Sequence, residues 1–180
     1  GFSKTPIREA LAQLKAEGLV VSEVHKGFRV FKMDEKELSE FCEYRLALES
    51  HALKNAYKND RLELVRVLKD FIKDFKESIK ENDFNKYNLI DTKFHKSFFI
   101  LSSNRYLTKN YENINGIIET IRTHTGPVIV DNYKLIDSIN GHISIHKHIK
   151  AKNLNLALEE LDKHINSWHD DRIIKSLLIP

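Results

Sequence analysis

Four side chains that can bind a metal ion recur at helical spacing in the second half of the sequence. Asp91 and His95 stand four residues apart in a segment with a helical apolar pattern, so both side chains leave the same helix face. His142 lies on the inward face of a later segment, and His164 interrupts an otherwise apolar stripe. Three nitrogens and one oxygen suit zinc or nickel first, and manganese or iron next. We therefore expect these four residues to close around one divalent ion inside a helical bundle.

Each of these residues also has a simpler explanation when it is taken alone. A histidine in a helix stripe is usually a hydrogen-bonded core residue, and nine histidines make chance spacing easier. A buried carboxylate is costly without a partner, however, and three imidazoles facing Asp91 would remove that cost. His146 shares the i,i+4 spacing with His142, and its part in the site is left open. His148 and His169 are expected at the surface.

The composition indicates a globular protein that does not cross a membrane. Of the 180 residues 41% are apolar, enough for a sizeable core, and no run of about 18 apolar residues occurs. The start of the sequence lacks a signal-peptide pattern, so we expect a cytoplasmic protein with no membrane contact. The single cysteine, Cys42, excludes an internal disulfide and a cysteine-built zinc site, and we expect it to be a small buried residue.

Helical periodicity predicts the elements that position the four donors. After residue 33 it predicts six helices, at about residues 34–56, 61–81, 83–102, 106–124, 133–151 and 155–176. The fourth is expected to end before Gly126-Pro127. Short connections between these segments predict an all-α fold, an antiparallel helical bundle over residues 33–180.

Residues 1–32 carry a different pattern. Thr5 can cap a helix with Pro6 at its first position, and Gly18 would end that helix. The β-prone runs at residues 19–22 and 28–31 would then pair in a hairpin with a basic tip. A helix followed by such a hairpin is the ending of a winged helix-turn-helix. We expect residues 1–32 to be the C-terminal part of this truncated domain.

This first part resembles the DNA-binding domain of GntR-family transcription regulators. The resemblance is carried by Ser3–Leu11, Leu14, Glu17–Val20 and Lys26–Val30. It implies that the helix enters the major groove of operator DNA and that the wing reaches the minor groove. By position, Lys4, Thr5 and Arg8 would contact phosphates or base edges, and Lys26 with Gly27 would form the wing tip. The two helices that precede this one in the family would lie ahead of Gly1, so we expect that an N-terminal segment is missing from this sequence.

The second part resembles the FCD effector domain of the FadR branch of that family. The resemblance is carried by Arg45–Glu49 with Ala52 and Ala56, by Asp91–His95, and by the spacing from His142 to His164. It implies that Asp91, His95, His142 and His164 hold the metal, that a small organic acid binds beside it, and that the protein is a homodimer on a pseudo-palindromic operator. Arg45 is expected to hold the carboxylate. The alternative is a surface pair between Arg45 and Glu49.

Together these features predict a ligand-responsive regulator of transcription that binds DNA. Two alternatives remain open. One is a sensor whose signal is the metal ion itself, and the other is an enzyme that activates water at an open metal position. The sequence contains no HExxH motif, phosphate-binding glycine loop or activated nucleophile. Because an isolated metalloenzyme would not need a DNA-binding segment, we expect the protein not to be an enzyme.

Overall fold

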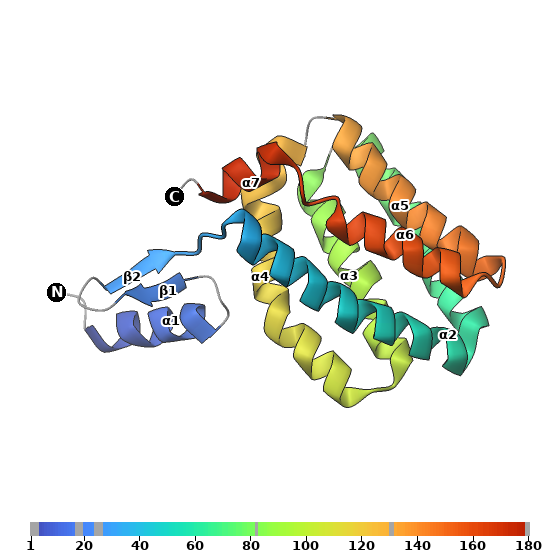
Figure 1. The fold of residues 1–180 in the computed structure, drawn as a ribbon, viewed down its shortest axis with the longest axis horizontal. Helices are drawn as coiled ribbons and strands as arrows, with labels where there is room; N and C mark the ends of the chain where they lie inside the picture. Colours follow the sequence, from blue (N-terminus) through green and yellow to red (C-terminus); the bar gives the residue numbers. More distant parts are fainter. Residues whose placement is uncertain (1–3, 17–19, 24–26, 82, 130–131, 179–180) are drawn as a thin grey trace.

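The computed structural model describes residues 4–16, 20–23, 27–81, 83–129 and 132–178. Figure 1 shows a small lobe beside a helical bundle. The lobe contains α1 (Lys4–Ala16), β1 (Val20–Glu23) and β2 (Gly27–Val30). The bundle contains α2 (Glu35–Lys80), α3 (Phe84–Ser102), α4 (Arg105–Ile129), α5 (Asn132–Lys150), α6 (Leu154–Asn166) and α7 (Asp171–Leu178). The predicted all-α class is confirmed, since the hairpin is the one sheet in these described ranges.

The small lobe has the predicted order of a helix followed by a hairpin. The prediction that Thr5 caps this helix is wrong, because α1 begins at Lys4 and Thr5 therefore lies inside it. The two strands pair in antiparallel orientation, with Val20 opposite Val30. Gly27, which opens β2, has a φ of 92°, a conformation that glycine adopts without strain. No side chain of α1 is buried, so the helix lies on the outside of this part of the structure.

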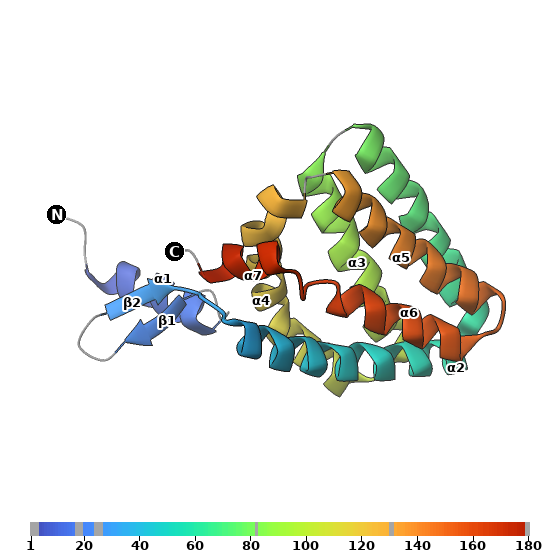
Figure 2. The same cartoon turned by 45° about the horizontal axis from the view of Figure 1, so that its top comes forward.

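The helix α2 is bent at Asp60. Asp34 caps its start, since the Asp34 side chain accepts a hydrogen bond from the Glu37 amide while the Glu37 side chain accepts one from the Asp34 amide. At Asp60 the backbone leaves the helical conformation, with φ −154° and ψ 90°, and its carboxylate accepts a hydrogen bond from the Glu63 amide. Figure 2 shows the two segments running in different directions. The break predicted at residues 57–60 is therefore confirmed, but only Asp60 is non-helical.

The helix α4 continues through Gly126-Pro127, so the end predicted for it there is wrong. Gly126 lies against Phe84 of α3, and a Cβ atom at this position would come within 2.8 Å of Cε1 of that ring. The glycine thus allows α3 and α4 to approach closely and does not end the helix. Pro127 removes one backbone donor, and it does so in the last turn of α4.

The prediction of one helix at residues 155–176 is wrong, because the structure has two helices in this range. The helix α6 ends at Asn166, and α7 begins after Asp170. Asp170 starts α7 because its carboxylate accepts a hydrogen bond from the Arg172 amide. Between the helices, Trp168 turns into the core and is 8% exposed. The apolar pattern continues across this break, so periodicity alone does not reveal it.

The helix α7 holds the segment that connects the small lobe to the bundle. It packs against α4, and both lie beside the start of α2 (Figures 1 and 2). The Met33 amide donates a hydrogen bond to the Leu177 carbonyl at 3.5 Å. Phe31 and Met33 are buried in the same core as Leu177. The connecting segment is therefore fixed to the bundle by the last helix.

The core of the bundle lies where α2 packs against α3, α5 and α6. Leucine, isoleucine and phenylalanine side chains make up most of it. Among the described residues, six acidic, arginine and histidine side chains are buried with them: Arg45, Glu49, Asp91, His95, Arg122 and His142. Burying such groups is costly unless they are paired, so this cluster marks a candidate functional site. None of the helices in the described part of the chain is long and apolar enough to cross a membrane.

Candidate metal centre

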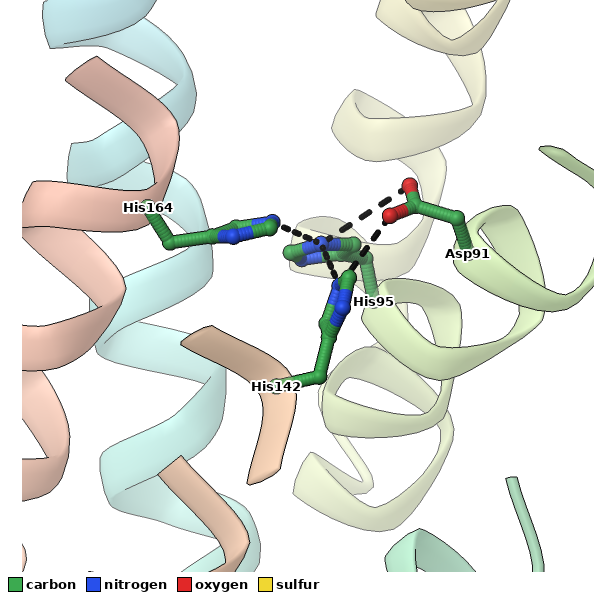
Figure 3. Close-up of side chains that lie close together, drawn as sticks. All are labelled: Asp91, His95, His142 and His164. Atoms are coloured by element: carbon green, nitrogen blue, oxygen red, sulfur yellow. Dashed lines mark hydrogen bonds and ion pairs between the residues drawn. The ribbon is translucent and has the colours of Figure 1, made fainter. Parts of the chain in front are cut away.

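The four predicted metal ligands lie together between three helices. Asp91 and His95 come from adjacent turns of α3, His142 from α5 and His164 from α6 (Figure 3). One donor atom of each residue lies within 4.8 Å of the others. Three of the residues are buried, and His164 is half-buried. The structure therefore brings all four side chains to one point, as their helical spacing predicts.

Three of the donor-atom distances match the spacing of ligands around one metal ion, and the four donor atoms all lie within 4.8 Å of one another. Nε2 of His95 lies 3.2 Å from Nε2 of His164 and 3.3 Å from Nε2 of His142. Nε2 of His142 lies 3.0 Å from Oδ1 of Asp91. Ligands about 2.0–2.1 Å from a zinc ion stand roughly 3.3 Å apart in a tetrahedron. The donor set and its spacing therefore fit a divalent first-row metal ion.

The three histidines of the cluster are held in the neutral form, which is the form that binds metals. Burial lowers the pKa of His142 and of His164 well below the usual value, and the neighbouring histidine and arginine side chains lower it further. Burial also lowers the pKa of His95, although the nearby Glu49 carboxylate opposes the shift. Each ring therefore offers a lone pair at neutral pH.

Arg45 and Glu49 form a buried pair beside the histidines. Nε of Arg45 donates to Oε1 of Glu49 at 2.6 Å, and the two side chains are 2% and 0% exposed. The pair is therefore not at the surface, which was one of the two alternatives for Arg45. The second oxygen, Oε2 of Glu49, lies 2.6 Å from Nδ1 of His95. Burial alone would raise the pKa of Glu49, but Arg45 and His95 outweigh it and bring this pKa to about 2.

One nitrogen of Arg45 is left without a hydrogen-bond partner. Nη2 is buried and has no acceptor among the described residues. The guanidinium lies 4.7 Å from the centroid of the Trp168 ring, a contact that helps to hold it in place. Because a buried donor without an acceptor costs free energy, an oxygen atom of a bound molecule would be stabilised here.

Arg122 of α4 belongs to the same cluster, and the sequence analysis missed it. Its Nη2 donates to Oδ2 of Asp91, and its Nη1 donates to the Thr92 hydroxyl, which is also bonded to Glu119. Burial and the nearby Arg45 lower the pKa of Arg122 to about 9. The available sequence signal is a charged residue on the apolar face of a predicted helix. Asp91 is therefore shared between the histidines and an arginine.

A cavity of about 400 Å³ opens beside these residues. Arg45, Asp91, Arg122 and His164 all contribute to its wall, so two of the four donor residues and both buried arginines face one space. Other parts of the wall are polar, with hydroxyl and amide groups from Ser138, Asn140, Ser144 and Ser167. A cavity of this size accepts a small organic molecule, and its two guanidinium groups favour an acidic one.

Gly141 makes room for His164, and it too was missed from the sequence. A Cβ atom at position 141 would lie 2.9 Å from Nδ1 of His164. The sequence signal was available, because a glycine inside a helix costs about 1 kcal/mol relative to alanine and so calls for a packing reason.

The other histidines singled out in the sequence do not join the donor cluster. His146 lies beside Val65 and Lys69 of α2, and its Nε2 is buried with no partner among the described residues. Burial lowers the pKa of His146. His169 is exposed, as predicted, whereas His148 is half-buried.

The residues predicted to contact DNA lie in the small lobe. Lys4, Thr5 and Arg8 are exposed in the first two turns of α1, and the four-residue spacing of Lys4 and Arg8 puts both on one face. Gly27 stands at the start of β2. Lys26 lies outside the described residues. A basic face of α1 and the hairpin are thus neighbours on one lobe.

Two protein-family models match the sequence. The one for bacterial regulatory proteins of the gntR family covers residues 1–30, and the one for the FCD domain covers residues 40–167. The gluconate operon transcriptional repressor of Bacillus subtilis is 25% identical, with 93% of this chain and 70% of that protein covered.

Solved structures share the fold. Escherichia coli McbR/YncC has a TM-score of 0.74 and 18% identity, and the match covers 93% of this chain and 78% of that one. The metal-free FCD domain of TM0439 has a TM-score of 0.66 and 23% identity, and the match covers 81% of this chain and 96% of that one. At these identities the likeness concerns the fold alone.

Proposed function

The chain belongs to the GntR family of bacterial regulatory proteins and contains an FCD domain, and from this premise we propose that its bundle binds a divalent metal ion and a small carboxylate that together control operator binding. As a member of this family it is a transcriptional regulator. We assign DNA binding to residues 1–32 and effector binding to residues 33–180. Membership of the FadR branch, a homodimeric state and a cytoplasmic location belong to the same proposal.

The proposed metal ligands are Asp91, His95, His142 and His164. Support comes from the grouping of their donor atoms within 4.8 Å and from the neutral state of the three rings. Zinc and nickel are the first candidates, with manganese and iron next. A bound ion would supply positive charge and open coordination positions for the oxygen atoms of a ligand.

The observation that carries the carboxylate proposal is the unpartnered Nη2 of Arg45 at the edge of the cavity. The other side of this guanidinium is already used, because Nε is bound to Glu49. A carboxylate oxygen at Nη2 would satisfy the last buried donor, and a charge-assisted hydrogen bond of this kind is strong. The polar cavity wall further favours a small acid with hydroxyl groups over a long apolar one.

DNA binding is assigned to the small lobe. The proposed contacts are Lys4, Thr5 and Arg8 of α1 in the major groove, with Lys26 and Gly27 at the wing in the minor groove. Their support is the exposure of α1 and the family model that covers residues 1–30. Because phosphate contacts displace counterions, the affinity for operator DNA is expected to fall steeply as salt rises.

A sensor of the metal ion alone is the second candidate. If the bound ion is four-coordinate, the four protein donors complete its site, and the ion would control the fold without a further ligand. Metal-dependent catalysis has less support, because the matched relative in Bacillus is a repressor. The two binding proposals differ in whether a carboxylate changes operator affinity at constant metal concentration.

The variant Arg45→Ala tests the carboxylate proposal. We suggest calorimetry with the zinc-loaded protein and a panel of small acids that begins with D-gluconate, the acid in the name of the Bacillus relative's operon. The variant is expected to keep metal and operator binding and to lose the response to the acid. Arg105→Ala, at the exposed start of α4, is the matched control. If Arg45→Ala binds the acid with the affinity of the wild-type protein, the effector binds elsewhere. If zinc alone changes the affinity for operator DNA, the metal-sensor proposal is favoured.

A further inference from the structure

We propose that Glu49 is a positioning residue shared by the metal centre and the effector-binding arginine, and that it thereby couples the two binding events. The proposal rests on the proposed function, since it takes both ligands as given. Glu49 is 0% exposed and uses one oxygen for each side of the site. Oε1 accepts from Nε of Arg45 at 2.6 Å, and Oε2 lies 2.6 Å from Nδ1 of His95.

The contact with Glu49 determines which nitrogen of His95 carries a proton. The carboxylate of Glu49 accepts a charge-assisted hydrogen bond from the guanidinium of Arg45 at 2.6 Å, and an ionised carboxylate only accepts hydrogen bonds. Nδ1 of His95 must therefore carry the hydrogen. An imidazole that binds a metal is neutral, so with the hydrogen on Nδ1 the lone pair lies on Nε2, which is the atom that faces the donor cluster. Glu49 thus holds His95 in the tautomer that a metal requires.

This role of Glu49 has no counterpart at His142. Nδ1 of His142 is buried without a partner among the described residues, so no carboxylate holds that ring in the same way. His95 is also the central member of the cluster, since its Nε2 is close to both other imidazoles. Its orientation therefore decides whether the cluster can close around an ion.

The same carboxylate also orients Arg45. Movement of Glu49 toward or away from either partner changes both contacts, because the two oxygens belong to one rigid group. An ion at the cluster fixes His95, which fixes Glu49 and, through it, the guanidinium that would take the effector. By thermodynamic reciprocity, each ligand then raises the affinity for the other by the same factor.

The tautomer of His95 can be tested in the wild-type protein. Long-range proton–nitrogen correlation spectra of the metal-free chain report which ring nitrogen of each histidine is protonated, and His95→Gln identifies the His95 signals by their loss. We expect a neutral His95 with the hydrogen on Nδ1. A hydrogen on Nε2 would overturn the proposal, because the lone pair would then point away from the cluster.

The coupling is tested by zinc affinity, measured by competition with a chelator. Gln in place of Glu49 offers one acceptor and one donor where the carboxylate offers two acceptors, so it cannot serve both Arg45 and His95. We expect Glu49→Gln to lower zinc affinity about 10- to 100-fold and Glu43→Gln, on the exposed side of α2, to leave it unchanged. Arg45→Met should alter zinc affinity in the wild-type background and should have no further effect in Glu49→Gln.

The outcomes separate this proposal from the proposed function. Wild-type zinc affinity in a folded Glu49→Gln protein overturns the role of Glu49 and leaves the metal site standing. A wild-type chain that binds neither zinc nor nickel overturns the metal site itself. If Glu49→Gln does not fold, Glu49→Asp replaces it, because the shorter side chain cannot reach both Arg45 and His95. The tautomer of His95 in the wild-type protein tests the role of Glu49 independently of any variant at position 49.

Discussion

Nε2 of His95 and Nε2 of His164 face each other at 3.2 Å, with ring centroids 5.1 Å apart. Only one of these atoms can donate a hydrogen to the other. With the hydrogen of His95 on Nδ1, as proposed above, Nε2 of His95 is an acceptor, so a hydrogen bond between the two rings requires a hydrogen on Nε2 of His164. A metal ion bound at both Nε2 atoms excludes that hydrogen bond, so metal binding requires both rings to carry their hydrogen on Nδ1.

Loss of either later histidine should remove the ion. His142→Ala and His164→Ala are expected to lose about one divalent ion per subunit, the amount of a single site. They should also lose the stabilisation of roughly 2.7 kcal/mol that a ligand gives at a hundred times its dissociation constant. Elemental analysis and thermal unfolding with added zinc measure both effects. His148→Ala is the control. A wild-type chain purified without chelator that holds no metal and gains no stability from zinc contradicts the site.

Gly141→Ala should weaken metal binding without touching a ligand. The new Cβ would lie 2.9 Å from Nδ1 of His164 and would push that ring out of place. Helix propensity works in the opposite direction, since alanine is favoured over glycine by about 1 kcal/mol. Zinc titration should show a roughly tenfold or greater loss of affinity. Gly126→Ala, which crowds Phe84 instead, should lower the melting temperature and leave zinc affinity unchanged; equal zinc affinity in both variants would argue against crowding of His164.

Arg8→Ala should abolish discrimination between operator and unrelated DNA in a protein that carries a complete DNA-binding domain. Arg8 is exposed on the same face of α1 as Lys4, so its loss should not affect folding of the bundle. A bidentate arginine–guanine contact is worth about 1–3 kcal/mol of discrimination. Gel-shift titrations at several salt concentrations measure it, with Arg105→Ala as the control. Unchanged affinity and specificity in Arg8→Ala would contradict the assignment of α1 to the major groove.

Cys42 should react with thiol reagents only when the bundle opens. Its side chain is fully buried, as predicted, and burial raises the pKa of this thiol to about 11. At pH 8 about one thiol in a thousand is then ionised, and the thiolate is the reactive form. The labelling rate of the native protein should therefore follow its unfolding, and bound zinc should slow it. Labelling as fast as that of the chain in guanidinium chloride would mean that α2 is not packed as described.

The grouping of the four proposed ligands could be predicted because the direction of each side chain depends on local spacing. Asp91 and His95 are four residues apart on one helix, and His142 and His164 interrupt apolar stripes, so helical geometry alone turns all four inward. The break at residues 57–60 was also visible as a change in the apolar pattern. In each case the information lies within one or two turns of a helix.

The buried charges could not be found in this way. Arg122 and Glu49 are residue types that usually lie at the surface, and their partners stand on other helices, Asp91 for the first and His95 for the second. The division between α6 and α7 was missed for a related reason: the apolar pattern continues across it, and the contact of α7 with α4 joins segments that are far apart in the sequence.

The hydrogen bond from the Met33 amide to the Leu177 carbonyl also has a consequence for synthesis. Chains leave the ribosome N-terminal end first, so the small lobe and the connecting segment emerge long before the helix that fixes them. Until α7 has been synthesised, Phe31 and Met33 of the connecting segment lack their contacts with Leu177. The contact that fixes the connecting segment to the bundle is therefore among the last to form, after α2 to α6 have been synthesised.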